Sequence, residues 1–185
     1  MTELATPLIA GAVAALGWYA TYAYARRRED RTRRIEIRLK YHQRQIEELY
    51  GPLSSLIQQI FIAWEVREDL LRAPGKAYSD DEIESIRELF WQRYFSPLHT
   101  EIAAILRTRL YLVEDGIIPD SFEDYLKHAT QEAAQHRLWS ELNIETEHVP
   151  GKPFPGRFDR DVREARDRLL EKVTTGLAAI DAAPR

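Results

Sequence analysis

The hydrophobic pattern of this chain starts with one continuous apolar run and changes to helical spacing beyond it. Residues 5–25 (ATPLIAGAVAALGWYATYAYA) carry no charged side chain and are followed at once by RRREDRTRR. An α-helix rises about 1.5 Å per residue, so about 20 apolar residues cross the roughly 30 Å hydrocarbon layer of a bilayer. The run therefore predicts a transmembrane anchor at residues 1–25, in contact with lipid through residues 5–25.

The charges on either side of the run predict how the anchor is oriented. Only Glu3 is charged before it, whereas six arginines follow it closely: Arg26, Arg27, Arg28, Arg31, Arg33 and Arg34. Because positive charge stays on the inner side of a membrane, we expect the N-terminus outside and the rest of the chain at the cytoplasmic face of the cell inner membrane. The arginines would then lie against the anionic lipids of the inner leaflet.

Two alternatives to a retained anchor stay open from the sequence. Ala23-Tyr24-Ala25 looks like the cleavage site of a signal peptide, but signal peptides carry positive charge before the apolar run, and here the charge follows it. The run could also be a buried helix of a hairpin, because its Thr, Tyr and Gly residues make it only moderately hydrophobic.

Beyond residue 34 the apolar residues recur every three or four positions, which is the spacing of one face of an α-helix. No segment shows the strict alternation of a half-buried strand. The predicted fold class is therefore all-α, with the transmembrane helix followed by a basic juxtamembrane helix at 26–50 and a cytoplasmic helical bundle at 51–185. The juxtamembrane helix should continue the anchor and pack along a seam formed by Ile35, Leu39, His42, Ile46, Leu49 and Leu53.

Local signals predict where the helices of the bundle begin and end. Gly51-Pro52 should kink or restart a helix, and Ser96 should cap a helix that Pro97 begins. Ser79 and Glu82 have the spacing of a capping box. Other expected boundaries are a turn at 73–76, a helix end at 114–116, a helix at 119–142, an extended proline-rich segment at 146–158 and a last helix from Asp159.

The large aromatic residues of the bundle fall at helical spacing. On this ground we expect Trp64, Trp91 and Trp139 to be core residues. Phe154 and Phe158 are expected to anchor the proline-rich segment on the bundle.

Composition limits the chemistry that the chain can perform. It has no cysteine, so disulfides and thiolate-bound metals are excluded. Residues 26–44 are basic and the rest of the cytoplasmic part is acidic, which argues against a nucleic acid partner. The sequence contains no glycine-rich phosphate loop, serine nucleophile elbow or HExxH signature, and we expect no cofactor.

Several short segments of the chain carry a resemblance to known sequences. They are Glu48-Leu49-Tyr50-Gly51-Pro52-Leu53, Phe90-Trp91 with Phe95-Ser96-Pro97-Leu98, Ile118-Pro119 to His128, and Pro153-Phe154-Pro155. The chain resembles a group of uncharacterised bacterial proteins that have one N-terminal membrane helix, an L-Y-G-P-L motif and a helical cytoplasmic part. The resemblance implies this architecture for most of the chain and implies no activity.

One group of side chains has the spacing of metal ligands. His128, Glu132 and His136 recur every four residues, which places them along one helix face. They are candidate ligands of zinc, iron or manganese, with His99 or Glu101 on the preceding helix completing the site. The alternative is a pair of half-buried, hydrogen-bonded histidines beside a surface carboxylate, with His136 at the edge of the core and His128 on the flank.

Two functional hypotheses follow from these observations. The first is a non-enzymatic, membrane-tethered helical module that binds or localises a protein partner, to which residues 146–158 would offer extended backbone and aromatic side chains. The second is a metal-dependent enzyme that uses His128, Glu132 and His136, so whether the chain is an enzyme stays open. Gly11 and Ala15 also have the small-residue spacing with which membrane helices associate, which favours a homo-oligomer.

Overall fold

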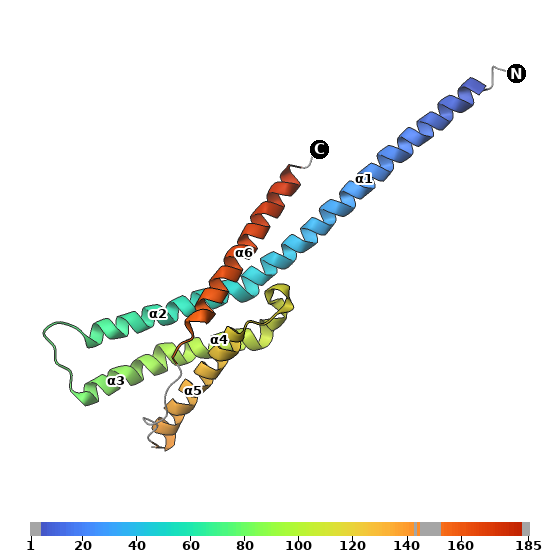
Figure 1. The fold of residues 1–185 in the computed structure, drawn as a ribbon. Coiled ribbons are helices and arrows are strands. Elements are labelled where there is room, and N and C mark those ends of the chain that lie inside the picture. Colours follow the sequence, from blue (N-terminus) through green and yellow to red (C-terminus); the bar gives the residue numbers. More distant parts are fainter. Residues whose placement is uncertain (1–4, 143, 145–152, 183–185) are drawn as a thin grey trace. The chain divides into compact units, whose positions relative to one another are not determined.

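All regular elements of the described residues are helices. The structure is a computed structural model that describes residues 5–142, 144 and 153–182 (Figure 1). Within these residues no strand is present, which confirms the predicted all-α class. The chain divides into two compact units: the helical unit Gln43–Glu171, and a second unit built from the segments before and after it.

The second unit contains most of the first helix, α1 (Ala5–Gln45), and the end of the last helix, α6 (Gly156–Asp181). The apolar run and the basic segment belong to one continuous helix, as expected. In this unit the two helices pack closely, because a Cβ atom added at Gly176 would lie 2.5 Å from Cδ2 of Leu39. Among the helices of the described residues, none combines the length and apolar character that crossing a membrane requires.

The helical unit is built from α2 (Gly51–Leu71), α3 (Asp80–Phe90), α4 (Ser96–Arg109), α5 (Asp120–Leu142) and the first part of α6. Helices α2 and α3 form an antiparallel hairpin (Figure 1). The predicted capping box at the start of α3 is confirmed: the backbone N–H of Ser79 donates to Oε2 of Glu82 at 2.9 Å, and the N–H of Glu82 donates to Oγ of Ser79 at 3.3 Å.

Both Pro-containing junctions are continuous helices rather than breaks. A π-helical turn, η1 (Ile46–Tyr50), joins α1 to α2, and a second one, η2 (Trp91–Phe95), joins α3 to α4. Proline lacks an N–H and its ring crowds the carbonyl four residues before it, and the wider turn accommodates both. The predicted cap at Ser96 is wrong, because Ser96 has helical dihedral angles (φ −59°, ψ −44°) and an N-cap residue does not.

Gly51 makes a close backbone contact in the first of these turns. Its backbone N–H bonds to the carbonyl oxygen of Ile46, five residues earlier. A Cβ atom at this position would lie 2.7 Å from that same oxygen, closer than real Cβ contacts. The glycine of the L-Y-G-P-L motif therefore allows the backbone to close the π turn.

Between α4 and α5 the chain makes two 3₁₀ turns, η3 (Leu110–Leu112) and η4 (Glu114–Gly116). Gly116 has φ +70°, which a glycine adopts readily. The predicted helix end at 114–116 is wrong, because α4 already ends at Arg109 and only the two short 3₁₀ turns follow it. The side-chain amide of the buried Gln45 donates to the carbonyl oxygen of Leu112 at 2.8 Å. The hydroxyl of Tyr50 accepts from the N–H of Glu114 at 3.0 Å. These bonds fix the turns on the η1 segment.

The core of the helical unit is formed by side chains from all of its helices. Its largest fully buried members are Tyr50, Leu53, Ile57, Ile102, Leu106, Phe122, Tyr125, Phe158 and Leu169. Phe158 is buried on α6 and Phe154 is half-buried against the core, as predicted. Helix α6 begins at Gly156, earlier than the predicted Asp159, and residues 146–152 of the predicted extended segment lie outside the described residues.

The expectation that the tryptophans belong to the core is wrong in two of three cases. Trp64 on α2 is 51% exposed and Trp139 on α5 is 40% exposed, and only Trp91 is half-buried against the core. Helical spacing identified the face on which each ring lies, but among the described residues no neighbouring helix buries Trp64 or Trp139. The proposed association face at Gly11 and Ala15 lies in the part of α1 whose side chains are not described.

Candidate functional site

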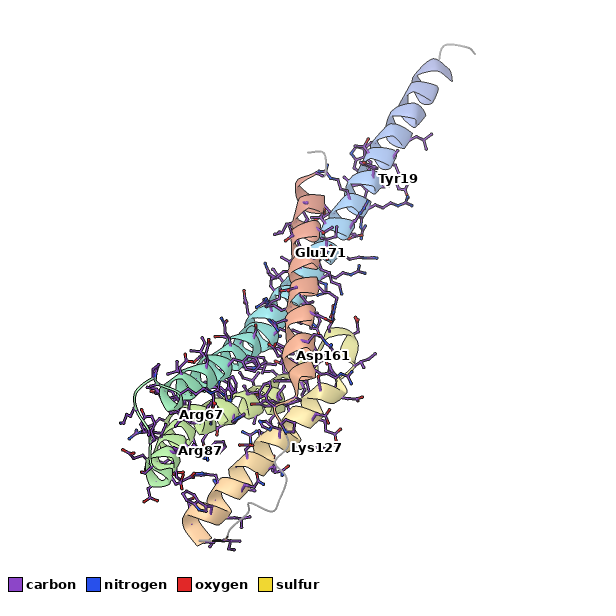
Figure 2. All side chains as sticks on the ribbon, turned by 60° about the vertical axis from the view of Figure 1, so that its left-hand side comes forward. Tyr19, Arg67, Arg87, Lys127, Asp161 and Glu171 are labelled. Atoms are coloured by element: carbon purple, nitrogen blue, oxygen red, sulfur yellow. The ribbon has the colours of Figure 1, made fainter. Side chains whose placement is uncertain are left out.

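A cleft of about 1270 Å³ in the helical unit is lined by three exposed aromatic residues, Phe61, Trp64 and Trp139, and by three histidines, His99, His128 and His136. It lies among α2, α3, η2 and α5, with Pro153 and Phe154 along its margin. Figure 2 labels one lining residue on each wall of the helical hairpin, Arg67 on α2 and Arg87 on α3. All of these elements belong to the same compact unit, so one folded body forms the cleft.

A buried histidine–tyrosine pair lies at the base of the cleft lining. Nδ1 of His99 on α4 lies 2.8 Å from the hydroxyl of Tyr125 on α5. Burial, and secondarily the neighbouring His128, lower the pKa of His99 from 6.5 to about 4, so the imidazole is neutral at pH 7. Burial raises the pKa of Tyr125 above its usual range. The pair is therefore an uncharged hydrogen-bonded link between α4 and α5.

His128 packs into the same aromatic group rather than lying on the flank of α5. It is only 6% exposed, and its ring meets the ring of His99 edge to face with centroids 5.3 Å apart. The ring of Phe154 contacts it in the same manner at 5.6 Å. The sequence-based assignment of His128 to the flank is wrong, because its neighbours Tyr125 and Ala129 are both buried.

His136 lies farther along α5 and pairs with a carboxylate of α3. Its Nε2 lies 3.4 Å from Oε1 of Glu88, and both side chains are partly exposed, at 20% and 24%. Its ring lies 5.2 Å from that of Trp91 and 6.4 Å from that of Trp139. His136 therefore stands at the edge of the core, as expected, and joins α5 to α3 across the cleft wall.

The three proposed metal ligands all line the cleft, with Glu132 half-buried between the two histidines in sequence. His128 is engaged with the buried rings, whereas His136 faces Glu88. Within the part of the chain that the structure describes, no three or more His, Cys, Asp and Glu side chains are arranged to hold a metal ion. The metal site stays a prediction. Of the two residues considered for completing it, His99 is bonded to Tyr125 and Glu101 is exposed on α4.

The charges around the cleft are mostly negative. Five carboxylates line it, from Asp80, Asp81, Glu84, Glu88 and Glu132, against two guanidinium groups, from Arg67 and Arg87. The guanidinium of Arg67 lies over the ring of Phe95, 5.2 Å from its centroid, and donates to Glu68 at 3.1 Å. Its Nε atom is buried and has no hydrogen-bond partner among the residues that the structure describes. Arg67 is thus held by packing against the cleft wall more than by polar contacts.

The aromatic residues of the cleft were visible in the sequence, but their spacing did not show that they line a surface. Aromatic residues at helical spacing indicate either a core or a binding surface, and only the packing of the neighbouring helices separates the two.

No protein family, curated protein or solved structure matches the chain. The geometry of the cleft is therefore the basis for the functional argument.

Proposed function

We propose that this protein is a non-enzymatic helical module that attaches to the cell inner membrane through the N-terminal part of α1 and holds a protein partner in the cleft. The single observation that carries the proposal is the set of large exposed aromatic side chains in the cleft. Phe61, Trp64 and Trp139 are 41%, 51% and 40% exposed, and all three line it. Concave surfaces with exposed aromatic anchors are typical of binding sites.

The membrane part of the proposal is supported by the composition of α1. Trp18, Tyr19, Tyr22 and Tyr24 are all at least 50% exposed, and Trp18 and Tyr22 stack with ring centroids 5.6 Å apart. Figure 2 shows Tyr19 on this helix. Such rings favour the headgroup layer of a bilayer, and the arginines that follow favour anionic lipid. This order of groups supports attachment with the helical unit on the cytoplasmic side.

In-cell photo-crosslinking of the full-length protein tests the partner. A photo-reactive amino acid replaces Trp64 in the cleft, and in a matched variant it replaces Tyr94, which is 48% exposed in the same unit but does not line the cleft. We expect a discrete protein adduct from position 64 and none from position 94. Identical adducts from both positions, or no adduct from position 64, would contradict the proposal.

A further inference from the structure

We propose that the occupant of the cleft is a cationic amphipathic helix of a partner protein. This inference rests on the proposed function, because it assigns a chemistry to the partner that the cleft would hold. Three properties of the lining carry it: its charge, its exposed rings and its size.

The charge of the lining favours a cationic occupant. The five carboxylates exceed the two guanidinium groups, and the ion pair between Glu84 and Arg87, at 3.7 Å with both side chains about half exposed, is too open to neutralise either residue. The two aspartates, Asp80 and Asp81, also lie in the first turn of α3, where they interact favourably with the helix dipole. Glu84 and Glu132 have no such role, so they are the carboxylates to test.

The exposed rings would take both the apolar side chains and the cationic groups of the occupant. Trp64 and Trp139 expose indole faces from two different helices, α2 and α5. An indole face attracts a lysine or arginine group, and more strongly when the pair is shielded from water. A segment that carries both aliphatic and basic side chains would therefore match a lining that contains both aromatic rings and carboxylates.

The size of the cleft favours a peptide element over a small molecule. Sites for small ligands occupy about 300–1000 Å³, and this cleft of about 1270 Å³ exceeds that range. Its walls are helices, and a groove between helices commonly receives the apolar face of a further helix. A helical segment therefore fits both the dimensions and the architecture.

Intrinsic fluorescence provides a direct test with the full-length protein. The chain has four tryptophans, and the Trp18→Phe variant leaves only Trp64, Trp91 and Trp139, all of which line the cleft. The probe is an amphipathic peptide of leucine and lysine, about 15 residues long so that a helix can form. The matched probe replaces every lysine by glutamate. We expect saturable changes in the emission of the variant with the lysine peptide and none with the glutamate peptide.

Removal of carboxylate charge from the cleft gives the decisive comparison in the same fluorescence measurement. Glu84→Gln with Glu132→Gln should raise the Kd of the lysine peptide by about fivefold or more. The control pair, Glu101→Gln with Glu123→Gln, removes the same charge from exposed positions outside the cleft and should leave the Kd unchanged. Equal weakening by both pairs would mean attraction to the acidic surface as a whole and would overturn the inference.

Three further outcomes would overturn the inference, and they show whether the proposed function fails with it. If neither peptide changes the emission while the cross-link at position 64 persists, the cleft holds a partner of other chemistry and only this inference is wrong. If the position-64 adduct is a second copy of this chain, a self-associated form occupies the cleft in place of a separate partner. If both peptide binding and cross-linking are absent, both proposals are wrong.

Discussion

Nδ1 of His99 lies 2.8 Å from the hydroxyl oxygen of Tyr125, and this contact joins two helices inside the core. His99 is 8% exposed and Tyr125 is fully buried. The hydroxyl of Tyr125 and Nδ1 of His99 are thereby paired with each other, as buried polar atoms require. The pair places a titratable group directly beneath the cleft.

Acid should destabilise the helical unit through His99. Its pKa in the folded state, about 4, lies below the ordinary value of 6.5, so as the pH falls through 6.5 the unfolded chain takes up the proton first. Stability from this group is complete above pH 6.5 and is lost as the pH falls towards 4, by about 3 kcal/mol at most. Denaturation followed by circular dichroism at pH 7 and pH 4.5 measures the loss.

Substitution separates His99 from the carboxylates that also titrate in acid. His99→Gln keeps a polar partner for Tyr125 and does not titrate, so it should reduce the difference in unfolding free energy between the two pH values. Tyr125→Phe removes the hydrogen bond, should cost about 1–3 kcal/mol at pH 7, and should leave the pH difference in place. If His99→Gln retained the full pH difference, His99 would not be its source.

The π turn before Pro52 should depend on its glycine. In Gly51→Ala the new methyl group would meet the carbonyl oxygen of Ile46 at 2.7 Å, and we expect a loss of about 1–3 kcal/mol in unfolding free energy. Ser96 occupies the same place in the second π turn and already carries a Cβ atom, so Ser96→Ala is the matched control. Thermal unfolding that showed equal costs for the two variants would argue against the steric explanation.

The start of α3 could be predicted from the sequence because it depends on neighbours along the chain. The capping box of Ser79 and Glu82 is a contact between residues three apart, and it forms as expected. The π turns were not predicted, because a proline after a glycine or serine is compatible with a kink, a restart or a wider turn. The local sequence does not determine which of these three forms. The packing of the flanking helices determines it.

Burial along α5 shows why the candidate site was only partly predictable. The buried residues of this helix are Ser121, Phe122, Tyr125, His128 and Ala129, all in its first half. Helical phase specifies which face points inward but not where along the axis the neighbouring helices end. His136 shares the phase of Tyr125, yet it lies beyond that limit and is half-buried. For the same reason Trp139 faces the cleft rather than the core.

Membrane attachment of α1 should be visible in the location of a C-terminal fusion. We expect a C-terminal alkaline phosphatase fusion to be inactive and a green fluorescent protein fusion to fluoresce, since arginines that follow an apolar run favour a cytoplasmic location of the chain after them. The protein should sediment with membranes and resist alkaline carbonate if α1 inserts. An active phosphatase fusion, or a mature chain that begins near Arg26, would contradict the proposed topology.

The two histidines of α5 should differ in their contribution to stability. His128 is 6% exposed and contacts the rings of His99 and Phe154, so His128→Ala should cost about 1–3 kcal/mol through lost packing and a cavity. His136 is more exposed than His128 and its contact with Glu88 is only partly shielded from solvent, so His136→Ala should cost less, about 1 kcal/mol. This order is the reverse of the one that helical phase suggested.

The same two variants test the metal hypothesis, because both histidines were proposed as ligands of one ion. If His128, Glu132 and His136 held a metal, either alanine substitution would open the site, and bound metal and melting temperature would fall together and by similar amounts. Elemental analysis of the purified full-length protein, with thermal unfolding of both variants, measures these quantities. We expect unequal losses of stability and no stoichiometric metal in the parent. Equal losses, together with metal in the parent that both variants lack, would instead favour a metal-dependent enzyme.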